Sequence, residues 1–405
     1  MKMTRFRDVD GGVAAPAGFR AAGVACGIKA GGKLDLSLLV SDRTASAAGV
    51  FTTNIAKAAP VLLSQEHLTR SGGQGRAIVI NSGCANACTG ADGHEHARKM
   101  AARTAEVVGC VPDSVLVAST GVIGVKLDIA KVERGVGDAA SRLSSDGGPA
   151  AARAIMTTDP FPKESAIEAA VNGRSFRVGG MAKGSGMIEP LMATMLGVVT
   201  TDAQVAPALL QRALKAAVDE TFNAITVDGE CSTNDCVFAL ANGSSGVELT
   251  EQDWPLLVDS LKAACEPLAI GIVRGGEGAT KLVTVRVTGA RSDEDARRTA
   301  RAIANSLLVK TAVHGGDPNW GRLVAVAGRA GSAFALEKAV VRIGPVTLFA
   351  DGTPHDDRAP DAAAYLQGTD IELEVDLGTG GPGHSRMWTC DLSAEYVRIN
   401  ADYRT

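Results

Sequence analysis

The sequence predicts an α+β fold, in which helices and strands are mixed and several strands form hairpin-like pairs. Segments with alternating apolar residues, typical of half-buried strands, occur along the whole chain, and segments with helical periodicity separate them. With 405 residues, of which 45% are hydrophobic, the chain is long enough for two or more structural units and can bury a sizeable core. The sequence shows no internal repeat and no low-complexity linker that marks a boundary.

The order of the predicted elements follows from these patterns. Residues 33–42 and 46–54 alternate as two strands do, and a short buried strand ends at Gly83. An alanine-rich helix is expected at about 94–108, followed by a buried strand at 115–120. Further strands are expected at 175–181, 195–202, 236–241, 321–328, 339–348 and 371–377, and further helices at 129–143, 149–156, 206–221, 254–270 and 293–308.

Charge and hydropathy exclude two classes of function. The formal charge is −4 and the sequence has no run of lysine or arginine, so a surface that binds nucleic acid is not expected. The sequence also lacks the roughly 18 consecutive apolar residues of a membrane-spanning helix, and its first residues lack the apolar core of a signal peptide. These features predict a cytoplasmic protein that does not interact with membranes.

The cysteines and histidines do not form a metal-binding pattern. Eight cysteines are too few for a disulfide scaffold in a chain of this length, and we expect free thiols. The pairs Cys84/Cys88 and Cys231/Cys236 lack the two-residue spacing of a zinc site. The two histidines that flank Glu95 point to different faces of the predicted helix, so they are not expected to share a metal.

The stretch that singles out this chain is residues 183–196, with the sequence KGSGMIEPLMATML. Its glycines and its proline exclude a helix, and its apolar residues indicate a buried strand-like segment. Thr194 is the one hydroxyl among these apolar residues, and it follows the small Ala193. Taken alone, Thr194 is an ordinary β-branched strand residue. Lys183 precedes a glycine rather than following one, so the stretch also lacks the phosphate-binding pattern of a P-loop.

This stretch resembles the self-processing site of the ornithine acetyltransferase family, also called glutamate N-acetyltransferase. The segments GVFTTN, NSGCANACTG, DGECSTND, HGGDPNWGR and WTCDLSAEYVRINADY resemble further signatures of the same family, so the resemblance covers essentially the whole chain. It implies that the chain cuts itself between Ala193 and Thr194 and that the new chains, 1–193 and 194–405, stay associated. It also implies a layered αββα-type sandwich with a smaller C-terminal α/β region.

The chemistry of such a cut can be followed from the residues. A threonine hydroxyl is a weak nucleophile at neutral pH, and the sequence has no GxSxG motif that would supply a serine triad. An N-terminal threonine carries its own base, because an α-amine has a pKa of roughly 7.7–8.0. The resemblance implies that Thr194 is the nucleophile and that Thr120 and Gly121 form the oxyanion hole. A glycine at the end of a strand permits the turn that such a pair needs.

The resemblance also implies the residues that bind a substrate with a carboxylate and a cationic tail. Lys183 suits the carboxylate and Glu277 suits an ammonium group. At one position two readings stay open, because Thr158 is adjacent to Thr157 and serves equally well. The implied substrate-binding residues are Thr157, Lys183, Thr194, Glu277, Asn400 and Thr405.

The activity implied by the resemblance is acetyl transfer in arginine biosynthesis. The acetyl group passes from N2-acetylornithine to Thr194 and then to glutamate, without a metal or organic cofactor, and the processed chains form an α2β2 assembly. Some members of the family also accept acetyl-CoA, and the sequence leaves that use open. Two alternatives from other classes remain: a self-processing amidase or aminopeptidase in which water is the acceptor, and a non-catalytic protein whose glycine loops bind an amino acid.

Overall fold

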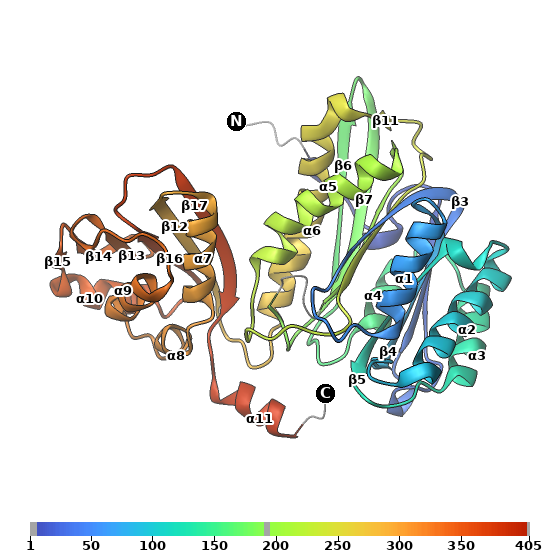
Figure 1. Ribbon diagram of the computed structural model, residues 1–405, viewed down its shortest axis with the longest axis horizontal. Helices are drawn as coiled ribbons and strands as arrows, with labels where there is room; N and C mark the ends of the chain where they lie inside the picture. Colours follow the sequence, from blue (N-terminus) through green and yellow to red (C-terminus); the bar gives the residue numbers. More distant parts are fainter. Residues whose placement is uncertain (1–5, 190–194, 403–405) are drawn as a thin grey trace. The chain divides into compact units, whose positions relative to one another are not determined.

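The computed structural model describes residues 6–189 and 195–402, which form two compact units (Figure 1). Unit 1 comprises the described residues up to Asn223 together with 230–272, and unit 2 comprises 224–229 and the described residues from Val273 onward. Both units combine helices with a sheet, which confirms the predicted α+β class. The predicted processing site, Ala193-Thr194, lies outside the described residues, so the division into chains 1–193 and 194–405 stays a prediction.

Unit 1 is built on a sheet that has nine strands within the described residues, in the order β1-β6-β7-β8-β10-β3-β4-β5, with β2 paired to β3. The β4/β5 and β8/β10 pairs are parallel and the other pairs are antiparallel. The strands are β1 (Phe6–Asp8), β2 (Phe19–Val24), β3 (Leu36–Phe51), β4 (Gln74–Cys84), β5 (Val115–Val122), β6 (Lys163–Val171), β7 (Arg174–Lys183), β8 (Leu196–Thr201) and β10 (Cys236–Ala241). A separate short pair joins β9 (Gln204–Val205) to β11 (Glu248–Leu249).

Strand β3 corrects one prediction, because 33–42 and 46–54 are not two strands but parts of one long strand. Its first part pairs with β2 and its second part with β10, and its register with β4 shifts between Val40 and Ala45. The polar residues in the middle of β3 are exposed, and in the sequence they resembled the polar residues of a turn. The sheet therefore continues through β3 instead of ending there.

Two apolar clusters lie on opposite faces of the β3–β5 region. One cluster joins Ile78 and Leu116 of β4 and β5 with Val198 and Phe238 of β8 and β10, so these parts of the sheet share one core. The other packs against helices α1, α2 and α3, which cover the outer face (Figure 1). This layering agrees with the sandwich that the family resemblance implies. The helices of unit 1 are α1 (Ala59–Arg70), α2 (Gly90–Val108), α3 (Ile129–Ser141), α4 (Gly148–Ile155), α5 (Pro207–Glu220) and α6 (Trp254–Arg274).

Unit 2 has one apolar core between a mixed sheet and its helices. Within the described residues the sheet order is β15-β14-β13-β16-β12-β17. The strands are β12 (Leu282–Ala290), β13 (Val340–Ile343), β14 (Val346–Ala350), β15 (Thr353–Pro354), β16 (Asp370–Asp376) and β17 (Gly383–Cys390). The helices are α7 (Asp293–Ala304), α8 (Leu307–Gly315), α9 (Trp320–Arg329), α10 (Ala359–Tyr365) and α11 (Ala394–Asp402).

Three predictions in unit 2 were wrong. The expected strand 321–328 is helix α9, because the Asn319 side chain caps the helix by accepting from the Arg322 amide, and the buried residues follow a helical period. The expected helix 293–308 is two helices, since Ser306 caps the start of α8. The expected strand 339–348 is the β13–β14 hairpin, which turns at Gly344 with a φ of 55°.

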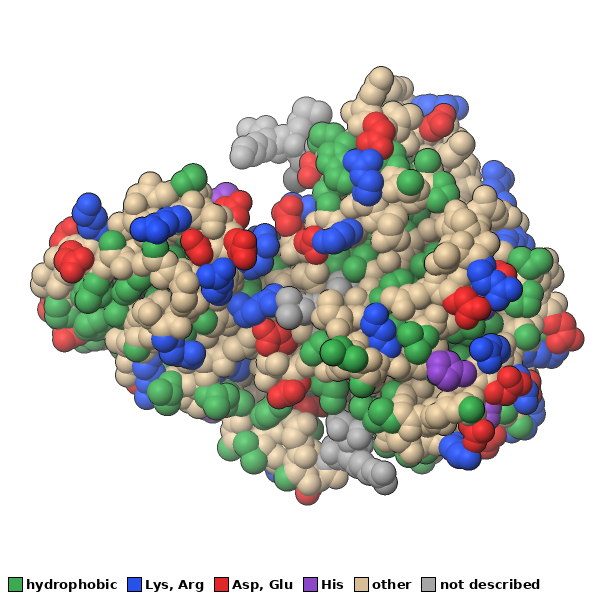
Figure 2. All heavy atoms as spheres, in the orientation of Figure 1, with side chains coloured by type: hydrophobic (Ala, Val, Ile, Leu, Met, Phe, Trp, Pro, Cys, Tyr) green, Lys and Arg blue, Asp and Glu red, His purple; other side chains and the backbone are tan. Residues whose placement is uncertain are grey.

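The charged side chains in view on the surface are of both signs. Acidic and basic side chains are interleaved on the visible face of each unit (Figure 2). Among the helices of the described residues, none is both long enough and apolar enough to cross a bilayer.

Candidate functional site

Thr120 and Gly121 lie at the end of β5, the edge strand of the unit 1 sheet. In the parallel pairing of β4 with β5, Gly83 is opposite Gly121, where the two backbones approach closely. A Cβ atom added to Gly121 would lie 2.4 Å from the carbonyl carbon of Gly83, and the φ of Gly121 is +128°. Only glycine fits this position, so the backbone requires the glycine of the Thr-Gly pair.

A buried polar network fixes the backbone just before this pair. The Ser119 hydroxyl donates to Oδ1 of Asn81 at 2.6 Å, and the Asn81 amide donates to the Cys84 carbonyl. The Asn234 amide donates to the carbonyls of Ala85 and Ser119, at 2.6 and 2.8 Å. Because buried polar groups are costly unless they are paired, this network holds the end of β5 in one conformation.

Lys183 brings an ammonium group to this strand end. It is the last residue of β7, its exposed fraction is 3%, and its Nζ donates to Oγ1 of Thr120 at 3.2 Å. Since the Thr120 hydroxyl accepts this bond, its own proton is directed elsewhere and stays available to a ligand. Lys183 also pairs with Leu196 of β8, which is two positions after Thr194 in the sequence.

A second buried ion pair adjoins Lys183. The Asp159 carboxylate accepts from Lys163 Nζ at 2.5 Å, from the Gly184 amide at 2.7 Å and from the Thr157 amide at 2.9 Å. Burial by itself raises the pKa of Asp159, but Lys183, Lys163 and these hydrogen bonds outweigh burial and hold the pKa at about 2. Burial lowers the pKa of Lys163, and Asp159 opposes that shift. The Asp159 carboxyl group is therefore ionised at neutral pH.

Lys29 is a third lysine in this region. Its Nζ donates to the carbonyls of Leu34 and Met156, and the carboxylate of Asp35 holds its loop by accepting four backbone amides. Burial lowers the pKa of Lys29 to about 8, and the charge of Lys183 contributes in the same direction. Lys29, Lys33, Lys163 and Lys183 thus outnumber the two carboxylates Asp35 and Asp159 in this region, which leaves an excess of positive charge. An excess of this sign favours an anionic ligand.

The structure brings most of the predicted unit 1 residues together. Thr120, Gly121 and Lys183 are adjacent, and Thr157 is joined to the end of β7 through the Asp159 carboxylate. Thr157 and Thr158 are both half-buried, so the choice between them stays open. The predicted nucleophile Thr194, the cleavage residue Ala193 and the terminal Thr405 lie outside the described residues.

Two further predicted residues meet within unit 2. Nδ2 of Asn400, on α11, donates to Oε2 of Glu277 at 2.8 Å. Glu277 has an exposed fraction of 8%, whereas Asn400 is exposed. A buried carboxylate with one neutral partner still has acceptor capacity for an ammonium group.

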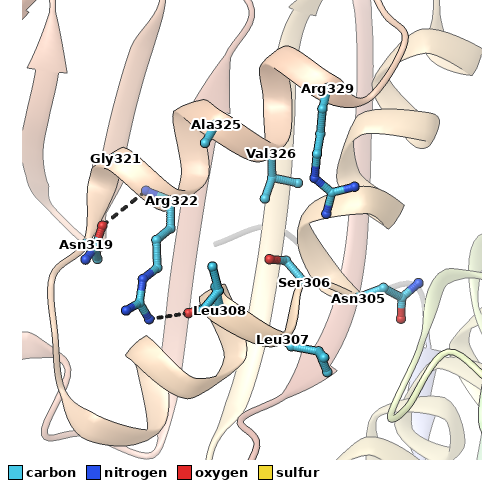
Figure 3. A pocket seen from close by; sticks show the side chains of 10 residues that line it. All are labelled: Asn305, Ser306, Leu307, Leu308, Asn319, Gly321, Arg322, Ala325, Val326 and Arg329. Carbon is cyan, nitrogen blue, oxygen red and sulfur yellow. Dashed lines mark hydrogen bonds between the residues drawn. The ribbon is translucent and has the colours of Figure 1, made fainter.

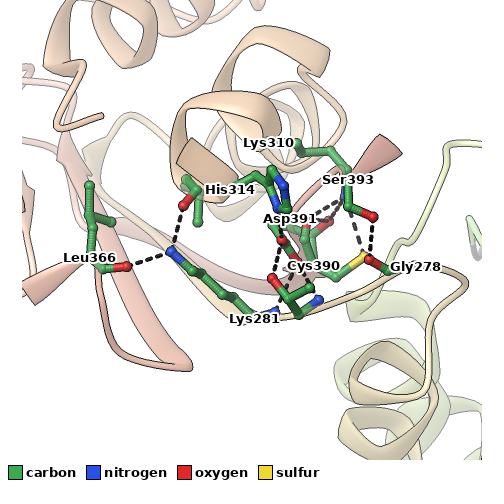
Figure 4. A network of polar contacts seen from close by, with 11 residues as sticks. Gly278, Lys281, Lys310, His314, Leu366, Cys390, Asp391 and Ser393 are labelled. Atoms are coloured by element: carbon green, nitrogen blue, oxygen red, sulfur yellow. Dashed lines mark hydrogen bonds and ion pairs between the residues drawn. The ribbon is translucent and has the colours of Figure 1, made fainter. Parts of the chain in front are cut away.

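Unit 2 holds a separate buried network around Asp391 (Figure 4). Its carboxylate accepts from the amides of Thr280 and Lys281, from the Thr280 hydroxyl and from Nδ1 of His314 at 2.7 Å. Burial raises the pKa of Asp391, but these hydrogen bonds outweigh burial and the net pKa is lowered. All the donors are supplied by unit 2, so the network connects its strands to α8.

A hollow of about 500 Å³ also lies in unit 2, and none of the predicted site residues lines it (Figure 3). Leu307, Leu308 and Val326 supply apolar walls, while Arg322 and Arg329 supply guanidinium groups. Arg322 is held by the Leu308 carbonyl at 2.6 Å. Among the described residues, no group of three or more histidine, cysteine, aspartate or glutamate side chains could hold a metal ion. All eight cysteines are free thiols.

Several residues of the site escaped the sequence analysis. The ion pair Asp159/Lys163 has a four-residue spacing that is visible in the sequence, but five residues that include two prolines do not form a helix, so the spacing predicted no contact. Asn81 and Asn234 fall in segments that resemble family signatures, yet only the fold shows that they meet at Ser119. Nothing in the sequence around Lys29 indicated that it belongs to the site.

A hydroxyl and a backbone amide side by side at the end of a strand, as at Thr120 and Gly121, suit donation to a negative oxygen such as forms in acyl transfer. A model of the ArgJ family matches residues 20–405. The chain belongs to the ArgJ family.

Similar proteins cover the whole length of the chain. The arginine biosynthesis bifunctional protein ArgJ of Synechococcus sp. is 48% identical over 100% of both chains. The protein of that name from Symbiobacterium thermophilum is 47% identical over 98% of this chain and 99% of its own. Among solved structures, the ornithine acetyltransferase complexed with ornithine from Mycobacterium tuberculosis is 45% identical, with a TM-score of 0.43, and covers 46% of this chain and 98% of its own.

Proposed function

We propose that the chain transfers the acetyl group of N2-acetylornithine to L-glutamate in arginine biosynthesis, through an acetyl ester on Thr194. Membership of the ArgJ family supports the reaction, since the relatives that match over their full length are named arginine biosynthesis bifunctional proteins. The observation that carries the site is the contact of Lys183 with Thr120 beside Gly121. Lys183 is the last residue of β7 and pairs with Leu196 of β8. Leu196 lies two positions after Thr194 in the sequence.

The first step is self-cleavage of the bond between Ala193 and Thr194. The Thr194 hydroxyl attacks the Ala193 carbonyl, the acyl group moves from nitrogen to oxygen, and water then releases residues 1–193. The product is an N-terminal threonine, whose amine has a pKa near neutrality and takes the hydroxyl proton. Cleavage therefore creates the base that the acetyl transfer needs.

The acetyl transfer follows a ping-pong route. Thr194 attacks the acetyl carbonyl of N2-acetylornithine, and ornithine leaves with the proton. Glutamate then attacks the acetyl ester and leaves as N-acetylglutamate. In both steps the negative oxygen is stabilised by the Thr120 hydroxyl and the Gly121 amide, and each such donor contributes roughly 2.7–4 kcal/mol.

Charge complementarity assigns the substrate-binding residues. Lys183, with its excess of positive neighbours, binds the α-carboxylate that ornithine and glutamate share. The unit 2 pair of Glu277 and Asn400 binds the ammonium group of the substrate. Thr157 and the terminal Thr405 complete the proposed set.

Two further parts of the proposal concern partners and location. Use of acetyl-CoA as a second acetyl donor stays open in this proposal; the relatives are named bifunctional, and their name does not say what the second activity is. The fragments 1–193 and 194–405 assemble as an α2β2 heterotetramer in the cytoplasm, with no cofactor in the reaction.

Product analysis tests the reaction directly. The purified chain is incubated with N2-acetylornithine, with and without glutamate, and acetylglutamate, ornithine and acetate are measured. Acetyl transfer predicts one acetylglutamate for each ornithine and little acetate. Release of ornithine and acetate at equal rates in both samples contradicts the proposal, because water would then be the acceptor as in an amidase.

A further inference from the structure

Asp159 connects three segments of unit 1 that the proposed reaction uses. Its Oδ2 accepts from the amide of Thr157, and its Oδ1 accepts from the amide of Gly184, directly after Lys183. Oδ1 also accepts from Lys163, the first residue of β6. The Asp159 side chain is 0% exposed, and that of Lys163 is 2% exposed. A carboxylate with three donors and no contact with water is fixed in position.

The same carboxylate lies among positive charges. Lys29 and Lys163 both repel Lys183, and Asp159 attracts all three lysines. Asp35 is the other carboxylate in this group, but it accepts four backbone amides and faces Lys29. Asp159 is therefore the carboxylate that attracts both Lys183 and Lys163 and also holds the chain on either side of the site.

We propose that Asp159 is a positioning residue for acetyl transfer, which holds the end of β7, with Lys183 beside Thr120, against the Thr157 segment. This inference rests on the proposed function, because Lys183 is taken as the group that binds the substrate carboxylate. Asp159 itself does not touch substrate. It acts through Lys183 and through the two backbone amides.

The substitution Asp159→Asn separates charge from shape. Asparagine has nearly the same size, but it is neutral, and its amide nitrogen cannot accept from a backbone amide. Lys163 and Lys183 then repel each other without the carboxylate between them. An opposite charge at this range shifts an ionisation by about one to three pH units. The pH at which the rate falls on the alkaline side of the profile, its alkaline limb, is therefore expected to move.

The experiment compares pH profiles of kcat/KM for N2-acetylornithine in the wild type and three variants. Asp159→Asn is expected to lower kcat/KM about 100-fold at neutral pH, mainly through KM, and to move the alkaline limb to lower pH by about one unit. The double variant Asp159→Asn/Lys163→Met removes one repelling neighbour, so its alkaline limb returns toward that of the wild type. Lys163→Met alone keeps the carboxylate and moves the limb to higher pH.

Asp202→Asn is the matched control. Asp202 is buried, its carboxylate accepts from the amides of Ala17 and Arg177, and it follows β8 at the end away from Lys183. A loss of stability alone is expected to lower the rate of this variant equally at every pH, with no movement of either limb. The same behaviour in Asp159→Asn would overturn the positioning role and leave a purely structural one.

The outcomes separate the inference from the proposed function. A wild type that makes no acetylglutamate sinks the proposed function before any variant is compared. A wild type that is active, beside an Asp159→Asn variant with an unchanged alkaline limb, sinks the inference alone. If Asp159→Asn does not fold, Lys163→Met decides the matter, because an alkaline limb that stays at the wild-type pH contradicts the repulsion on which the inference rests.

Discussion

Asp159 in unit 1 and Asp391 in unit 2 are buried carboxylates with similar surroundings but different neighbours. Each accepts two backbone amides, and each also accepts from a side-chain nitrogen, of Lys163 or of His314. In both cases burial opposes ionisation and the hydrogen bonds and charges overcome it, so both pKa values are lowered. By local geometry the two groups are equally well satisfied.

The lysines around them differ. In unit 2, Lys281 donates to the carbonyls of Val313 and Leu366, and Lys310 donates to the hydroxyl of Thr389 and the carbonyl of Cys390. The hydrogen bonds of these two ammonium groups therefore stabilise the fold of unit 2. In unit 1, Lys183 donates to a hydroxyl at the end of an edge strand, with an excess positive charge around it.

The comparison teaches that a buried polar cluster is not by itself a functional site. In the unit 2 cluster, the hydrogen-bond donors are matched by acceptors of the same chain. The unit 1 cluster has positive charge that its own carboxylates do not neutralise, and it has a hydroxyl whose proton is available. Substitutions in the unit 1 cluster, whose charges are not balanced, are therefore expected to affect function. Substitutions in the balanced unit 2 cluster are expected to affect stability.

The largest difference is expected for the two threonine hydroxyls. Thr120→Ala removes one donor to the oxyanion and the acceptor of the Lys183 hydrogen bond, so it is expected to lower kcat by about 100- to 1,000-fold and also to lower the melting temperature. Thr120→Ser keeps the hydroxyl and is expected to stay within about tenfold of the wild type. Steady-state kinetics and thermal unfolding of both variants check this.

Thr280→Val is the counterpart in unit 2, where the hydroxyl donates to Asp391. It is expected to lower the free energy of unfolding by about 1–3 kcal/mol and to leave kcat unchanged. A large loss of kcat in this variant, or none in Thr120→Ala, contradicts the distinction between the two clusters.

The two buried lysines offer an intermediate effect. Lys183 and Lys310 each have an exposed fraction of 3%. Lys183→Met is expected to raise KM by about 10- to 100-fold, since it removes a hydrogen bond to a charged group worth about 1.5–3 kcal/mol. Lys310→Met leaves two buried acceptors without a donor, so it is expected to lower stability while KM stays unchanged. Kinetics normalised to folded protein, measured by circular dichroism, distinguish the two.

The smallest effect is expected in the free energy of unfolding at acid pH. The pKa of Asp159 falls from 3.8 to about 2 in the fold, so its contribution is fully present above about pH 4 and is lost as the pH falls toward 2. At 1.36 kcal/mol for each pH unit, the contribution is about 2 kcal/mol. Urea unfolding of the wild type between about pH 2 and 5 should show this loss, and Asp159→Asn should show a flatter acid limb. Identical limbs in the two proteins would rule out the low pKa.

The sequence predicted most of the unit 1 elements because their apolar patterns match their burial. Strand β10 was predicted with the bounds that it has, and β5 and α5 within two residues. In unit 2 the pattern misled: the alternation of apolar residues at 321–328 was taken for a strand, although the Asn319 cap makes it a helix. The Asn319 cap favoured a helix more strongly than the weak alternation of apolar residues favoured a strand.

The predicted site residues came from the family resemblance, whereas their surroundings came from the fold. Thr120, Gly121 and Lys183 are adjacent as expected, and Glu277 contacts Asn400. The contact of Asp159 with Gly184 spans 25 residues, and the contact of Asn234 with Ser119 spans 115 residues. No periodicity in a sequence encodes such long-range pairs, because they depend on how the strands are ordered in the sheet.

The central claim is that Thr194 cuts the chain and then carries the acetyl group. Intact mass spectrometry of the purified chain, before and after addition of N2-acetylornithine, tests both parts at once, with Thr194→Ala beside it. The account predicts two fragments in the wild type, the second beginning at Thr194 and gaining the mass of one acetyl group, and one uncut, unmodified chain in the variant. An uncut wild type, or an acetyl group on the fragment 1–193, would contradict the account.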